Sequence, residues 1–165
     1  MRRIATTLVF VIGVISLGSV GKAQELTTAA STYASFGFDD LDGTLPLSAE
    51  LRFTMPVSEK FALEPFVTLG ESGGRHRSGL EGFYGLQVRQ RIGFVANGFM
   101  FATYGVAGYY SKYGYDGPVI GHFGFGLKER LSEHLVFRPE VHFVTVGVIP
   151  VGARFVAGFS IDRGR

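Results

Sequence analysis

Eight short segments of this chain alternate apolar and polar residues, and turn residues separate them. The clearest alternation runs from residue 45 to residue 57, where Leu51 and Phe53 share one face and Glu50 and Arg52 the other. Because successive side chains of a β-strand point to opposite faces, this pattern predicts strands with one apolar and one polar face. Eight tilted antiparallel strands can close into a barrel, and closure leaves no strand edge unpaired. We therefore predict an all-β protein that forms an eight-stranded, antiparallel, up-and-down β-barrel.

The first 23 residues have the features of a signal peptide. Two arginines follow the initial methionine, an apolar run occupies residues 8–20, and small residues precede a cleavage point after Ala23. The apolar run is roughly 13 residues long, whereas a transmembrane helix needs about 18 or more. We therefore expect residues 1–23 to direct export and residues 24–165 to form one barrel domain.

Composition excludes several functional classes. Without the predicted signal peptide the chain has 13 basic and 14 acidic residues, a net charge of −1, so it lacks the basic surface that nucleic-acid binding requires. The absence of cysteine excludes disulfides, zinc–thiolate sites and thiol catalysis. The chain has 24 glycines and 16 phenylalanines but lacks long runs of helix-forming residues, which favours strands.

The lengths of the connections predict how such a barrel is oriented. The links at 58–60, 93–97 and 132–134 are short and fall on one side, together with both ends of the domain. The links on the other side are longer, apart from a short turn at 147–150; they occupy residues 39–44, 71–78 and 111–118. Outer-membrane barrels have short periplasmic turns and longer external loops, so we expect both termini to face the periplasm.

A partial internal repeat supports the barrel. Residues 58–67 resemble residues 132–141, and the two copies begin the third and seventh predicted strands. Those strands stand on opposite walls of an eight-stranded barrel. We therefore expect Glu64 to face Arg138 across the lumen, although two turn–strand units can also be similar by chance.

Two kinds of barrel share this alternation. A soluble, lipocalin-like barrel turns its apolar face inward around a ligand, whereas a transmembrane barrel turns that face outward to lipid. The polar face carries charges of both signs together with several glycines, as a narrow, self-neutralising lumen requires, and the apolar face is rich in bulky Phe and Leu. We therefore predict a transmembrane barrel with an interior ion network rather than a conducting pore; the network comprises Glu50, Arg52, Glu64, Arg89, Lys128, Arg138, Glu140 and Arg154.

Three stretches near the end of the chain carry a family resemblance: 124–127 (Gly-Phe-Gly-Leu), 137–141 (Phe-Arg-Pro-Glu-Val) and 157–161 (Ala-Gly-Phe-Ser-Ile). With these, the chain resembles the small eight-stranded outer-membrane barrels, such as the membrane domain of outer-membrane protein A and the opacity-protein-like family. The resemblance implies a bacterial outer-membrane location and insertion by the assembly machinery, which recognises a final strand ending in an aromatic residue. Phe159 fits that signal, whereas residues 162–165 extend beyond it.

One loop offers a competing, enzymatic interpretation. His76 and Ser78 have the His-x-Ser spacing of outer-membrane lipid A deacylases, and Glu81 lies nearby. The three residues lie in or next to a glycine-rich segment, which favours an ordinary solvated loop. Arg75 and Arg77 of the same loop could contact lipopolysaccharide phosphates.

We expect neither a metal nor a cofactor. The acidic stretch 39–43 begins like a calcium loop, but Ala49 stands where the twelfth-position glutamate belongs. His122 and His142 fall on the lumen face without a matching third ligand.

Tyrosines and prolines at particular strand positions lead to two further expectations. The tyrosines around the fifth strand suit an aromatic belt at a membrane interface: Tyr104, Tyr109, Tyr110, Tyr113 and Tyr115. Pro65 and Pro139 fall inside predicted strands, where we expect β-bulges.

We predict a monomeric outer-membrane barrel with a structural or surface-interaction role and no catalysis, which contacts membrane lipid and lipopolysaccharide. The alternatives are a lipid-modifying outer-membrane enzyme and a soluble periplasmic lipid carrier.

Overall fold

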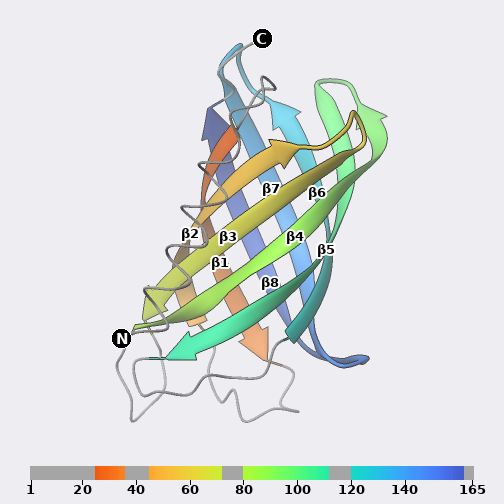
Figure 1. The fold of residues 1–165 in the computed structure, drawn as a ribbon. Coiled ribbons are helices and arrows are strands. Elements are labelled where there is room, and N and C mark those ends of the chain that lie inside the picture. The colour runs from red at the N-terminus through yellow and green to blue at the C-terminus, as the bar shows by residue number, and fades with distance from the viewer. Residues whose placement is uncertain (1–24, 36–44, 72–79, 112–119, 162–165) are drawn as a thin grey trace.

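A computed structural model describes residues 25–35, 45–71, 80–111 and 120–161 of the chain. These residues form eight antiparallel strands that close into a barrel in chain order (Figure 1). The strands are β1 (Glu25–Ser35), β2 (Leu45–Pro56), β3 (Phe61–Glu71), β4 (Leu80–Val95), β5 (Gly98–Ser111), β6 (Ile120–Arg130), β7 (Leu135–Val146) and β8 (Ile149–Ile161).

The barrel closes between its first and last strands. β1 pairs with β8 in an unbroken register from Leu26 opposite Ile161 to Ser35 opposite Gly152. This pairing confirms the predicted eight-stranded, antiparallel, up-and-down fold. In the described part of the chain, no helix has the length and apolar character needed to span a membrane.

Side chains alternate between the lumen and the outer wall as the sequence predicts. Along β7, Arg138, Glu140 and His142 are buried, while the residues between them are partly exposed. On the outer wall, Phe125 and Phe155 are exposed large apolar residues. The apolar lumen expected of a lipocalin-like barrel is therefore contradicted along most of the barrel, because charged side chains occupy the inside and hydrocarbon side chains the outside.

The internal repeat is also a repeat of structure. At the first turn, Ser58 Oγ accepts a hydrogen bond of 3.1 Å from the backbone N–H of Phe61. At the second, Ser132 Oγ accepts the equivalent bond, 3.2 Å long, from the N–H of Leu135. Each turn therefore enters its following strand in the same way, and equivalent positions of β3 and β7 lie at corresponding places along their strands.

The expectation of bulges at the two strand prolines is wrong. The paired residues of β2 and β3 go from Arg52–Phe66 to Met55–Leu63 at constant register, so the ladder is interrupted beside Pro65 without an inserted residue. A proline removes one N–H donor from a ladder, and here that loss requires no change of register. The register shifts of the described strands lie elsewhere, namely between Ser31 and Tyr33, Arg91 and Gly93, and Val144 and Thr145.

Candidate functional site: the charged lumen and the lipid-facing wall

The lumen holds four carboxylates and five basic side chains among the described residues. All eight predicted network residues point into it, and Glu25 joins them. Apart from Lys128 they are buried. If the two lumen histidines are not counted, the network therefore has five cations and four anions, an excess of one positive charge.

Glu64 on β3 is the centre of one half of this network. Its carboxylate accepts hydrogen bonds of 2.8 Å from Thr54 Oγ1 and 2.8 Å from Gln87 Nε2. Both terminal nitrogens of Arg138 donate to it across the lumen, each at 3.2 Å. Arg89 Nη1 lies 3.2 Å from the same carboxylate. Neighbouring and opposite walls of the barrel therefore converge on one buried anion.

Arg52 on β2 is the centre of the other half. Its Nη1 donates to Glu140 at 2.6 Å and 2.8 Å, and its Nη2 donates to Glu50. Arg154 Nη1 lies 3.1 Å from the second oxygen of Glu50. Arg138 Nη2 lies 3.2 Å from Glu140, so this arginine joins the two halves into one network.

The two lumen histidines lie next to each other beside the charged residues, with their rings tilted by 53°. His142 Nε2 lies 2.9 Å from Glu140 Oε2, and because a carboxylate only accepts hydrogen bonds, the ring donates here. The His122 ring lies 5.5 Å from the His142 ring and 5.4 Å from the Phe66 ring. Within the described ranges, no three His, Cys, Asp or Glu side chains are grouped as metal ligands.

Glu25 is a network member that sequence reasoning missed. Its carboxylate accepts a hydrogen bond of 2.5 Å from Lys128 Nζ and another from Ser160 Oγ. The network predicted from the sequence did not include this residue, which is the first residue of β1. Extending the alternation backward from Thr27, a buried residue, would have placed Glu25 on the same inward face.

Aromatic rings line the network, and the alternation pattern did not indicate them. The Phe101 ring centre lies 5.1 Å from Arg138 Cζ, and the Phe66 ring centre 4.9 Å from Arg154 Cζ. Both phenylalanines are inward-facing and buried. Their ring faces stabilise the adjacent guanidinium groups by cation–π attraction, which is strongest where water is excluded.

Toward the longer connections the lumen holds an apolar cluster, beside the buried hydroxyl groups of Ser31, Ser48 and Thr68. All members of the cluster except Phe66, which is at the middle of β3, lie toward the strand ends on that side: Tyr33, Phe66, Phe83, Ala107, Ile120, Val144 and Val151. Tyr109 packs against this cluster, with its ring 5.5 Å from that of Phe83. The expectation that Tyr109 belongs to an outer aromatic belt is therefore wrong, whereas Tyr104 is exposed on the outer wall.

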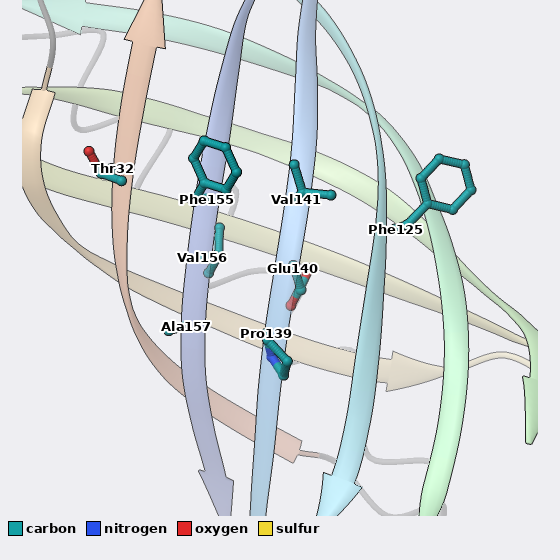
Figure 2. A pocket seen from close by; sticks show the side chains of 8 residues that line it. All are labelled: Thr32, Phe125, Pro139, Glu140, Val141, Phe155, Val156 and Ala157. Atoms are coloured by element: carbon teal, nitrogen blue, oxygen red, sulfur yellow. The ribbon is translucent and has the colours of Figure 1, made fainter. Parts of the chain in front are cut away.

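The outer wall carries a shallow apolar groove of about 480 Å³. Figure 2 shows Phe125, Val141 and Phe155 on three neighbouring strands, with Pro139 and Ala157 beside them. Pro139 and Ala157 are paired residues of β7 and β8, and their small side chains leave space between the larger ones. Its walls offer little besides hydrocarbon, so the groove suits an apolar chain rather than a polar ligand.

Several predicted features lie outside the described residues. They are the signal peptide at 1–23, the acidic stretch 39–43, the loop with Arg75, His76, Arg77 and Ser78, and Tyr113 and Tyr115.

Comparisons with known proteins agree on the fold. No protein-family model matches the sequence, and no curated protein matches it significantly. Among solved structures, Neisserial surface protein A matches with a TM-score of 0.56 and 9% identity, over 84% of this chain and 95% of that one. The Yersinia pestis outer-membrane protein Ail, solved in a phospholipid nanodisc, matches with a TM-score of 0.51 and 13% identity, over 84% and 99%.

A third solved structure, the outer-membrane protein AlkL in lipid bilayers, gives a TM-score of 0.50 and 17% identity, over 88% of this chain and 90% of that one. At these identities the likeness concerns the fold and nothing finer. The chain therefore has the fold of the small eight-stranded outer-membrane β-barrels, as its sequence resemblance implied.

Proposed function

We propose that this protein is a monomeric, integral β-barrel of the bacterial outer membrane with a structural or surface-interaction role and without catalysis. The observation that carries the proposal is the sidedness of the wall. Large apolar side chains on all the described strands face outward, whereas Arg52, Glu64 and Arg138 are at most 1% exposed inside. In water such an exterior would aggregate, but in a bilayer it contacts lipid, and barrel closure leaves no strand edge unpaired.

The placement in the outer membrane rests on further support. The fold is that of barrels solved in phospholipid bilayers, and the leader has the features of an export signal. In the orientation given by the turns, the short links at 58–60 and 132–134 face the periplasm and the longer connections face outward. Those connections would meet lipopolysaccharide or a surface partner, and the assembly machinery would insert the barrel.

The lumen favours a structural role over conduction. Each charged side chain of the network has an oppositely charged neighbour within 3.5 Å. An eight-stranded barrel is just wide enough for side chains to fill it, and the apolar cluster follows the charged residues toward the outer end. In planar bilayers, the purified protein should therefore give no stepwise ion currents.

Membrane fractionation of cells that express the chain tests the location. The protein should sediment with outer-membrane markers, resist extraction by carbonate or urea, and change its gel mobility when heated before electrophoresis. Recovery in the soluble periplasmic fraction with bound lipid would instead support a carrier, and would contradict the proposal.

A separate assay tests the absence of catalysis. The purified, refolded barrel is incubated with lipid A, and released fatty acid is measured for the parent protein and for His76→Ala and Ser78→Ala. We expect no release above a heat-unfolded control in any of the three. Hydrolysis by the parent that both substitutions abolish would establish the enzyme instead.

A further inference from the structure

The hairpin between β7 and β8 ends in an apolar tip. The exposed fraction is 39% for Val146, 95% for Val148 and 59% for Ile149. From residue 143 to residue 153 the sequence contains no charge, and Thr145 is its one polar side chain. Turns that face water are usually built from Gly, Asn, Asp, Ser and Pro, so a valine at this tip is chemically out of place in water.

The exposure of the tip follows from a defined backbone geometry. Val146 and Ile149 are paired residues, which leaves Gly147 and Val148 as the two central positions of the turn. Gly147 has a φ of 60°, a conformation that glycine adopts without strain. The tight turn thus holds Val148 away from the rest of the described barrel. Because the turn has only two central residues, it cannot fold back and bury this side chain, as a long loop could.

The other connections at this end of the barrel have a different composition. Each contains charged residues in its sequence: Asp39, Asp40 and Asp42 in the first, Arg75 and Arg77 in the second, and Lys112 and Asp116 in the third. The β7–β8 turn is also the shortest of the four, with two residues between its strands. One of the four connections is therefore built for a different environment from the others.

We propose that the β7–β8 tip is a membrane-inserted anchor, seated in the acyl chains of the leaflet on the side of the longer connections. The tip continues the apolar outer wall formed by Val141, Phe143 and Phe155 on the same two strands, so the surface that meets lipid extends to Val148 with the uncharged Thr145 as its one polar side chain. In Figure 1 the hairpin is the blue ribbon at the lower right, away from the end where β8 terminates. This inference rests on the proposed membrane location.

Insertion of the tip into the membrane changes which connections are available to water and to a surface partner. Three of the four connections, rather than all four, would then face water, and the tip would bring lipid close to the end of the lumen that holds the apolar cluster. Val144 and Val151 line that end from inside, on the same two strands as the tip. A surface partner would therefore approach the barrel from the side of β1 to β6.

Single-tryptophan variants test the depth of the tip, because the chain contains no tryptophan. Val148→Trp is refolded into phosphatidylcholine vesicles whose acyl chains carry bromine, which quenches only indoles that lie in the hydrocarbon. Phe125→Trp, on the outer wall, is the control for membrane insertion, and Glu133→Trp, in an exposed short turn, is the control for a water-facing position. Acrylamide, a quencher confined to water, gives the converse measurement.

We expect Val148→Trp to lose fluorescence in brominated vesicles, more with bromine near the ester end of the chains than near the methyl end, and to resist acrylamide. Glu133→Trp should behave in the opposite way. Loss of fluorescence for Phe125→Trp but not for Val148→Trp would overturn the anchor while leaving the membrane barrel intact. Protection of Val148→Trp from both quenchers would also overturn the anchor, since a second copy or another protein would then cover the tip. If bromine did not quench Phe125→Trp, the result would contradict the proposed membrane location itself.

A second variant keeps the test decisive if Val148→Trp does not fold, as judged by gel mobility. The chain lacks cysteine, so Val148→Cys takes a single nitroxide spin label. The label should collide more often with oxygen, which concentrates in hydrocarbon, than with a water-soluble nickel complex. A preference for nickel would contradict the anchor.

Discussion

Arg138 donates two hydrogen bonds to Glu64, each 3.2 Å long, although the two residues lie 74 positions apart in the chain. They occupy equivalent places in the two copies of the turn–strand repeat, one on β3 and one on β7. The repeat therefore presents a carboxylate and a guanidinium from opposite walls at the same depth. The bidentate geometry resists both displacement and rotation of the two walls relative to each other.

Replacing Glu64 with Gln should destabilise the barrel strongly. The substitution leaves three carboxylates facing five cations in the described network, with Arg138 and Arg89 no longer opposed by this buried carboxylate. Breaking a buried pair at one partner costs about 3–5 kcal/mol. The free energy of unfolding, measured by urea titration in phospholipid vesicles, should fall by that amount.

The double variant Glu64→Gln/Arg138→Met is the informative comparison, since it returns the network to the parent's excess of one cation. It should be more stable than Glu64→Gln alone. Glu133→Gln, at an exposed turn position, should change the free energy of unfolding little and serves as the control. A double variant no more stable than Glu64→Gln alone would contradict a network governed by charge balance.

A positive charge on the outer wall should be costly in proportion to its depth in the bilayer. Phe125 is near the middle of β6 and is 49% exposed. Phe125→Arg should lower the free energy of unfolding in vesicles by about 2–4 kcal/mol, whereas Leu131→Arg, at the short-turn end, should cost about 0–1 kcal/mol. Equal costs at the two positions would argue against a transmembrane placement of the wall.

Gly105 on β5 should tolerate no side chain. A Cβ there would lie 2.5 Å from His122 Nε2 and 2.5 Å from the backbone oxygen of Leu86, and a backbone atom cannot move aside cheaply. Overpacking of this kind costs about 1–3 kcal/mol, so Gly105→Ala should unfold at a lower urea concentration than the parent. Gly93→Ala is the matched control, because its Cβ would meet the flexible end of Met100 at 3.1 Å. Similar stability of the two variants would count against the tight packing around His122.

Phe101 should contribute strongly to the stability of the barrel. It is fully buried inside the barrel and its ring lies against Arg138 and Arg89. Phe101→Ala should cost about 3–5 kcal/mol, because it leaves a cavity and removes the ring faces from two buried cations. Phe94→Ala removes the same side chain at a position that is 74% exposed, and its effect on the urea midpoint should be small. Near-equal losses in the two variants would mean that Phe101 is not packed as the structure has it.

The sequence predicted the faces of the strands well, because the faces depend on a local rule. In an extended chain each residue points away from its neighbour, so the alternation of Glu50 and Arg52 with Leu51 and Phe53 specifies sidedness wherever a strand forms. The same rule, combined with the repeat, indicated that Glu64 and Arg138 share the lumen. Closure then followed from the number of strands and the lengths of their connections.

What alternation could not provide is the identity of each partner across the lumen. The tilt and register of all eight strands decide that Arg52 meets Glu140, 88 residues away, and that Lys128 meets Glu25, 103 residues away. The position of each side chain across the lumen depends on the registers of many strand pairs added together, and no local sequence pattern encodes that total. Inward aromatic residues such as Phe101 were missed for a related reason: their apolarity suits an outer wall, and they are stable inside because arginine side chains stack on them.

The sequence by itself thus determined a closed barrel of eight strands, with charge inside and hydrocarbon outside, since both follow from a period of two and from turn lengths. The tertiary structure decided how the lumen is filled: a charged network toward the short turns, an apolar cluster toward the other end, and an apolar β7–β8 tip. The physical reason is that depth in a barrel depends on strand stagger, which accumulates around the whole circumference and is fixed only when β8 pairs with β1.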